Sequence, residues 1–297
     1  MNAVETTRDD DVRPPQHCGW LLGVGQLPLF YRTWQPNVDA RAAVLVTHGL
    51  GDHSGRYAQL AESLAAEGNA VYALDQRGHG RSAGPRTAGD ISDSVADVST
   101  MVGLIKRDLP GRRIFLAGHS WGGLVTLAYA VDHPHDVHGL ILSAPAARPK
   151  NASTIQIVLG KLLANIAPNT GVATIPFDQV SSDPRVVEAQ RADPLTHQGP
   201  IRARMASQML TAMKHVAKGL PALSMPVLLL HGTGDVIAYP STSRYVHDAI
   251  GSHDRTLKFY EGLRHQIFNE PQHELVFADV ITWLERQRTA DTYGRIR

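Results

Sequence analysis

The feature that most constrains the fold is a regular alternation of apolar runs with helical patterns. The apolar runs are as short as strands and almost wholly apolar, as strands covered on both faces are; they occupy 42–49, 69–76, 113–120 and 137–145. Apolar residues recur at helical spacing between them, over 57–68, 94–111 and 122–134. This alternation predicts an α/β fold with a mostly parallel sheet and helices on both faces. We expect a further strand at 26–34, at the edge of the sheet.

The alternation stops over 146–220. Helical patterns at 153–167 and 203–220 follow one another there without a clear strand between them. Strands and helices then alternate again, in the order strand, helix, strand, helix, at 226–235, 241–251, 256–265 and 274–287. We therefore predict a core domain formed by 16–145 and 221–297, with 146–220 inserted as a helical cap over the ends of the strands. Residues 1–15 are polar and interrupted by proline, which indicates a disordered tail.

Composition excludes several classes of protein. The chain has 29 basic and 28 acidic residues among 297, with no dense Lys/Arg block, so we expect no nucleic-acid partner. Cys18 is the single cysteine, which rules out an intrachain disulfide. The first residues lack the basic and apolar pattern of a signal peptide, and no apolar run is long enough to span a membrane. We expect a soluble, cytoplasmic protein, and the sequence carries no signal for its oligomeric state.

Gly118-His119-Ser120-Trp121-Gly122 matches the pattern G-x-S-x-G. An apolar strand pattern precedes it and a helical pattern follows it, which is the context of a nucleophile elbow. The sharp turn strains the serine backbone, and only small residues fit on either side. The elbow would place the Ser120 hydroxyl at a helix N-terminus, where developing negative charge is stabilised.

A serine hydroxyl needs a base and an orienting acid, which in such folds follow in the order Ser, Asp or Glu, His. Asp235 follows one late strand and His265 follows the next, so both are expected at the same edge of the sheet as Ser120. An aspartate after a strand is often only a turn residue, and the chain has 15 histidines. The occurrence of both in the required order favours a triad. The N–H groups of Leu50 and Trp121 would form the oxyanion hole.

Several segments together resemble the monoacylglycerol lipase and lysophospholipase branch of the α/β-hydrolases, especially its bacterial members. They are HGLGDHSGRY, LDQRGHGRS, GHSWGG, SSDPRVVEAQRADPL, HGTGDVIAYP and GLRHQIFNEP. The resemblance runs from about Gly19 to the last helix.

The resemblance implies Ser120, Asp235 and His265 as the triad, Leu50 and Trp121 as oxyanion donors, and a mobile apolar cap over an acyl-chain tunnel. It also implies that Asp52 and Arg56 lie near the glycerol end of the pocket, with Asp52 where relatives usually have Glu. Trp121 stands where relatives commonly have Met, and its wider side chain is expected to alter the pocket wall.

The cap sequence fits a lipid substrate. The helical pattern contains an apolar stripe that Ile157 and Leu163 widen; its members are Ile155, Val158, Leu159, Leu162 and Ile166. Such a stripe can simply pack on the core. We expect that Ile157 and Leu163 instead bind substrate at its entrance and that the cap transiently contacts a lipid interface.

These observations predict a carboxylic ester hydrolase that forms an acyl-enzyme on Ser120 and uses no metal or organic cofactor. The resemblance narrows the substrate to monoacylglycerols or lysophospholipids, and we favour monoacylglycerol, cleaved to glycerol and fatty acid. A lysophospholipase, or an esterase or amidase for small non-lipid substrates, is the alternative within enzymes. A non-catalytic binding protein on a hydrolase fold is a further alternative, because a fold alone implies no activity.

Overall fold

The computed structural model describes residues 17–87, 89–148 and 163–294, with side chains up to residue 288. The tail predicted for 1–15 and most of the predicted helix at 153–167 lie outside the described residues.

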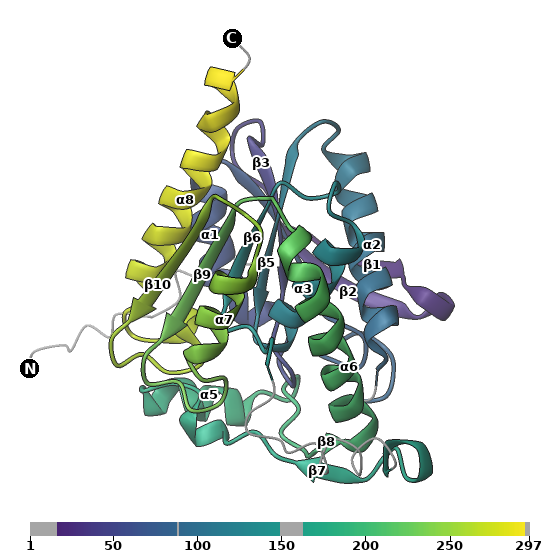
Figure 1. Ribbon diagram of the computed structural model, residues 1–297. Coiled ribbons are helices and arrows are strands. Elements are labelled where there is room, and N and C mark those ends of the chain that lie inside the picture. Colours follow the sequence, from purple (N-terminus) through teal and green to yellow (C-terminus); the bar gives the residue numbers. More distant parts are fainter. Residues whose placement is uncertain (1–16, 88, 149–162, 295–297) are drawn as a thin grey trace, which may run out of the picture.

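A sheet of eight strands forms the centre of the fold, in the order β1-β2-β4-β3-β5-β6-β9-β10 (Figure 1). These strands are β1 (His17–Leu22), β2 (Pro28–Trp34), β3 (Ala42–Thr47), β4 (Asn69–Leu74), β5 (Arg113–His119), β6 (Gly139–Ser143), β9 (Val227–Gly232) and β10 (Arg255–Tyr260). From β4 to β10 every neighbouring pair is parallel, whereas β1 and β2 are antiparallel to their neighbours. The predicted mostly parallel sheet is confirmed.

Helices cover both faces of the sheet. One face packs against α1 (Ala58–Ala66) and α8 (His273–Gly294). The other packs against α2 (Ile91–Asp108), α3 (Trp121–Asp132) and α7 (Ser241–Ala249). Neighbouring residues of a strand contribute to opposite faces: Leu45 of β3 belongs to the α2 and α3 side and Val44 to the α1 and α8 side. Because each strand is buried on both faces, its sequence is an apolar run rather than an alternation.

The segment between β6 and β9 connects two strands that are neighbours in the sheet. It contains β7 (Gly171–Ala173), α5 (Pro184–Ala192), β8 (Ile201–Arg202) and α6 (Ala203–Gly219), with short 3-10 helices η3 (Phe177–Gln179) and η4 (Leu220–Ala222). In Figure 1, α5, β7 and β8 lie beyond the lower end of the sheet, while α6 runs upward beside α3. The three other 3-10 helices are η1 (Val24–Gln26), η2 (Ser54–Tyr57) and η5 (Ile267–Asn269).

Two expectations about strands were wrong. The strand predicted as an edge at 26–34 has a neighbour on each side, because β1 pairs with β2 and forms the edge itself. The inserted segment was expected to lack strands, yet β7 and β8 pair antiparallel within it. The strands β7 and β8, with three and two residues, are too short to show a period of two. In β1 the large apolar residues Trp20 and Leu22 are exposed, so this strand does not have the apolar run of a buried strand.

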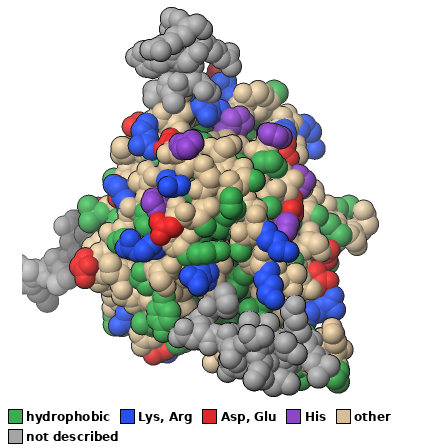
Figure 2. All heavy atoms as spheres, viewed as in Figure 1, with side chains coloured by type: hydrophobic (Ala, Val, Ile, Leu, Met, Phe, Trp, Pro, Cys, Tyr) green, Lys and Arg blue, Asp and Glu red, His purple; other side chains and the backbone are tan. Residues whose placement is uncertain are grey.

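The surface shows no single dominant feature on the face drawn in Figure 2, where Lys and Arg side chains are scattered among polar and apolar ones. Within the described part of the chain, every helix is too short or too polar to cross a membrane.

Candidate active site

Ser120 lies in the turn between β5 and α3, as the G-x-S-x-G pattern predicts. Its backbone has φ 53° and ψ −115°, a conformation that residues other than glycine rarely adopt. A Cβ atom at Gly122 would lie 2.2 Å from the carbonyl oxygen of Thr47, and one at Gly118 would lie 2.7 Å from that of Gly122. The two glycines are therefore required by close backbone approach, which brings the elbow against the end of β3.

Asp235 and His265 meet at the same end of the sheet. The Nδ1 atom of His265 lies 2.7 Å from Oδ2 of Asp235, and both side chains are buried. The other oxygen, Oδ1, accepts hydrogen bonds from the N–H groups of Ile237 (2.8 Å) and Ala238 (3.0 Å). Burial by itself raises the pKa of Asp235, but the nearby His265 and His231 hold this pKa far below its ordinary value. The carboxylate is therefore ionised and fixes the ring of His265 through Nδ1.

Ser120 and His265 line one small cavity of about 30 Å³. The cavity is also lined by residues of the loop after β3, the cap and the loops near His265, namely Gly49, Leu50, Asp52, His119, Ile175, Phe177, Val180, Gln190, Ile237 and Gln266. No hydrogen bond joins Ser120 to His265 in this structure. Hydrogen bonds of this kind are often long before a substrate binds, so the shared cavity is the relevant observation.

Leu50 and Trp121 have backbone N–H groups without a hydrogen-bond partner among the described residues. Leu50 lines the cavity, and Trp121 is the first residue of α3. The indole of Trp121 is buried in the cluster that packs α2 and α3 on the sheet, and it is not among the residues that line the cavity. The side chain of Trp121 is therefore not part of the wall of this small cavity, and its effect on the pocket that binds substrate stays a prediction.

Asp52 and Arg56 lie beside the cavity as an ion pair, with Arg56 Nε 3.1 Å from Asp52 Oδ1. Tyr57 donates a hydrogen bond to the same carboxylate at 3.3 Å. The Nη2 atom of Arg56 lies 2.9 Å from the amide oxygen of Gln266 and 3.5 Å from that of Gln190. The two glutamines line the catalytic cavity, and sequence reasoning missed both. Only their places in two of the quoted family segments could have drawn attention to them.

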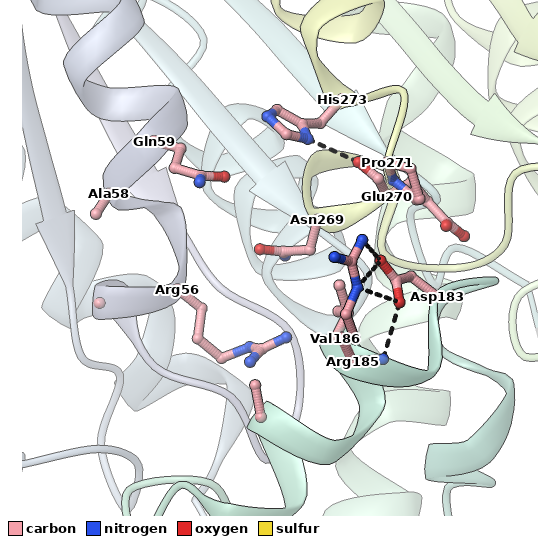
Figure 3. A pocket seen from close by; sticks show the side chains of 12 residues that line it. Arg56, Ala58, Gln59, Asp183, Arg185, Val186, Asn269, Glu270, Pro271 and His273 are labelled. Carbon is pink, nitrogen blue, oxygen red and sulfur yellow. Dashed lines mark hydrogen bonds and ion pairs between the residues drawn. The ribbon is translucent and has the colours of Figure 1, made fainter. Parts of the chain in front are cut away.

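A second cavity of about 600 Å³ lies on the other side of Arg56 (Figure 3). Its walls come from the start of α1, the start of α5 and the loop before α8; they include Gln59, Asp183, Arg185, Val186, Asn269, Glu270 and His273. Arg185 binds Asp183 through its guanidinium, with the shortest distance 2.8 Å. Arg56 thus lines this second cavity and also contacts Gln190 and Gln266, which line the catalytic one.

Two cap residues were also predicted to bind substrate. Leu163 is half-buried and does not line it, and Ile157 lies outside the described residues. Ile175, Phe177, Val180 and Ile237 supply the apolar wall instead. These residues have no helical or strand period, so no pattern in the sequence predicts them. Among the described residues, no group of three His, Cys, Asp or Glu side chains could hold a metal ion.

Comparison with known proteins identifies the family of the chain. The model of the family described as "Serine aminopeptidase, S33" matches residues 38–272. The monoacylglycerol lipase of Mycolicibacterium smegmatis is 38% identical over 266 residues, which are 89% of this chain and 95% of the relative. The human monoglyceride lipase is 34% identical over 93% of each chain.

A solved structure shows the same fold. The monoacylglycerol lipase of Paleococcus ferrophilus superimposes with a TM-score of 0.79 and 30% identity, covering 87% of this chain and 99% of that one. The α/β-hydrolase fold and the family resemblance expected from the sequence are thereby confirmed: the chain is similar to monoacylglycerol lipases, and it belongs to the serine aminopeptidase S33 family.

Proposed function

We propose that the protein is a serine hydrolase that cleaves monoacylglycerol into glycerol and a fatty acid, with Ser120, His265 and Asp235 as its triad. One observation carries this proposal: the buried Asp235–His265 pair, at 2.7 Å, opens onto the same cavity as the strained Ser120. The similarity to monoacylglycerol lipases over almost the whole chain supports the choice of substrate.

The reaction follows from the roles of these groups. Asp235 accepts a hydrogen bond from Nδ1–H of His265, so Nε2 is free to take the proton of Ser120 as Oγ attacks the ester carbonyl. The N–H groups of Leu50 and Trp121 stabilise the oxyanion that forms. His265 then gives its proton to the leaving glycerol oxygen. A water molecule, deprotonated by His265, hydrolyses the acyl-enzyme and releases the fatty acid.

The lining of the cavity separates a polar from an apolar end. We propose that Asp52, Arg56, Gln190 and Gln266 bind the glycerol hydroxyl groups, and that Ile175, Phe177 and Val180 contact the acyl chain. A volume of about 30 Å³ is far too small for a long acyl chain. Substrate binding therefore requires these three cap residues to move away from Ser120. This is the role we assign to the cap, residues 146–220.

Contact with lipid remains a proposal that rests on the sequence. Replacing Ile157 and Leu163 with Ser is expected to impair hydrolysis of emulsified long-chain substrate more than that of a soluble short-chain ester. Equal effects on both substrates would refute a role at the substrate entrance or at a lipid interface. The single cysteine fits a reducing compartment, and we place the enzyme in the cytoplasm, with transient contact to lipid surfaces through the cap.

The central test is a panel of mono-, di- and triacylglycerols, lysophospholipids and short-chain esters, assayed with the wild type and with Ser120→Ala. We expect monoacylglycerol to be the best substrate and Ser120→Ala to be inactive. A fluorophosphonate should label the wild type stoichiometrically and leave Ser120→Ala unlabelled. Activity on short esters only would refute the lipase assignment. A folded wild type that is neither labelled nor active would instead support a binding protein.

Lysophospholipid hydrolysis is a second candidate, favoured by the cavity beyond Arg56. Its volume of about 600 Å³ is large enough for a head group, and the guanidinium of Arg185 can bind a phosphate there in place of the Asp183 carboxylate. Arg185→Gln should then lower kcat/KM for a lysophospholipid and leave that for monoacylglycerol unchanged. The exposed Arg107, which lies on α2, offers Arg107→Gln as the matched control. Equal kcat/KM of Arg185→Gln and Arg107→Gln on lysophospholipid would remove this candidate.

A further inference from the structure

A second histidine contacts the carboxylate that we assign to the triad. His231 lies in β9, four residues before Asp235, and its side chain is fully buried. Its Nε2 atom lies 3.0 Å from Oδ2 of Asp235 and 2.6 Å from the carbonyl oxygen of Ala238. Its Nδ1 atom lies 2.7 Å from Oγ of Ser243, a buried residue of α7. The catalytic scheme above makes no use of this residue.

The contacts of His231 determine its tautomer. A carbonyl oxygen can only accept a hydrogen bond, so Nε2 must carry a proton that it shares between Ala238 and Asp235. In the neutral ring Nδ1 is then an acceptor, and the hydroxyl group of Ser243 donates to it. Ser243 thus fixes the tautomer in which Nε2–H points at the carboxylate.

We propose that His231 is a positioning residue for the reaction, which holds the Asp235 carboxylate in the orientation that His265 needs. This inference rests on the proposed function of the same site. Oδ2 of Asp235 is shared between His265 and His231, while Oδ1 is held by the N–H groups of Ile237 and Ala238. Because His231 also binds the carbonyl oxygen of Ala238, it fixes the loop as well as the carboxylate. Without its N–H group, the carboxylate can turn away from Nδ1 of His265, and the imidazole loses its orientation.

Two amide substitutions separate this role from simple packing. The Nε2 group of glutamine can occupy the place of the histidine Nε2 and donate to Asp235, whereas asparagine reaches only as far as Nδ1, toward Ser243. We expect His231→Gln to keep kcat within about fivefold of the wild type. His231→Asn should lower kcat by about 10- to 100-fold, the range typical of groups that orient a functional histidine, with KM within about twofold. The rate of fluorophosphonate labelling should fall by the same factor as kcat.

The control and the second variant keep the test decisive. His247→Asn changes a partly exposed histidine of α7 whose Nδ1 lies 3.0 Å from the carboxylate of the neighbouring Asp248, and its kcat should equal that of the wild type. Ser243→Ala removes the donor to Nδ1 and should lower kcat by about three- to tenfold, which decides the matter if His231→Asn does not fold. The proposal is overturned if His231→Asn folds and has the kcat of the wild type. It is also overturned if His231→Gln and His231→Asn lower kcat by the same factor. If Ser120→Ala is inactive in the same assays, the proposed function stands even then.

Discussion

Replacing Ser120 with glycine is expected to give a more stable protein than replacing it with alanine, although both variants lack the proposed nucleophile. The Ser120 backbone has φ 53° and ψ −115°, and a residue with a Cβ atom in this conformation lowers the stability of the fold by about 1–3 kcal/mol. Glycine adopts it at little cost. Glycine also gives the unfolded chain more freedom, which lowers stability by about 0.4–1 kcal/mol relative to alanine. At the middle of both ranges the difference is about 1.3 kcal/mol, so we expect the glycine variant to be more stable by about 1–2 kcal/mol.

This difference is large enough to measure. The entropy of unfolding for 297 residues is about 0.6 kcal/mol/K, so the Tm of Ser120→Gly should exceed that of Ser120→Ala by about 2–3 °C. The Ser120 side chain makes no hydrogen bond to a described residue, and both variants keep the backbone bonds to Ser143 (2.9 Å) and Ala146 (3.0 Å). Calorimetry and urea unfolding of the pair provide the measurement. Equal stability, or a more stable alanine variant, would refute the argument that the elbow is strained.

Three further outcomes follow from the contacts around the site. Gly122→Ala should lose folded protein or at least about 1–3 kcal/mol of stability, because its Cβ would lie 2.2 Å from the backbone oxygen of Thr47; a Tm equal to that of the wild type contradicts this. Burial lowers the pKa of His48 to about 4 and that of His79 to about 3, so both stay neutral in the folded protein while the unfolded chain binds protons below about pH 6.5. From about pH 6.5 down to pH 4, each of these histidines should therefore lower the free energy of unfolding by about 1.4 kcal/mol per pH unit. In urea unfolding, His79→Gln should lose about 1.4 kcal/mol less stability per pH unit than the wild type. An equal loss in both proteins would contradict the neutral state of His79. Glu270 is fully buried and accepts hydrogen bonds from the cap and from the His265 loop. In Glu270→Gln the amide NH2 group would face some of these donors, so the variant should lose about 1–3 kcal/mol of unfolding free energy in the same assay. A variant as stable as the wild type would show that these hydrogen bonds do not stabilise the fold.

The alternating strands, the elbow and the order of Ser120, Asp235 and His265 could be predicted because their signals are local. A parallel strand buried on both faces needs an apolar run wherever its neighbours lie, and a sharp turn needs small residues beside the serine. Asp235 and His265 each follow one of two parallel strands, β9 and β10. Their position at the same edge of the sheet therefore follows from the parallel order of the strands.

The walls of the cavity could not be predicted in this way. Gln190 comes from α5 and Gln266 from the loop after β10, and only the packing of the cap on the core brings both to Arg56. Leu163 shows the converse: it belongs to an apolar helical stripe, yet this pattern does not tell which surface the stripe meets. Periodicity fixes the face of a helix, whereas the partner of that face is a property of the whole fold.

Two of the four His-Gly pairs of the sequence, at 48–49 and 231–232, show how local signals encode part of the site. Each pair ends or follows a central strand, and each histidine is fully buried. His48 binds the carbonyl oxygen of Gly49 at 2.8 Å through Nδ1 and accepts the N–H group of Gln76 at 2.9 Å through Nε2, which holds the loop that carries Leu50. His231 holds the loop that carries Asp235, and a Cβ at Gly232 would lie 2.2 Å from the carbonyl oxygen of Leu263, so this glycine lets the His265 loop come close. In both pairs the histidine fixes the loop that presents a proposed catalytic group. A buried histidine at the end of a parallel strand is therefore itself a signal for such a loop, and its partners, Gln76 and Ser243, are what the structure adds.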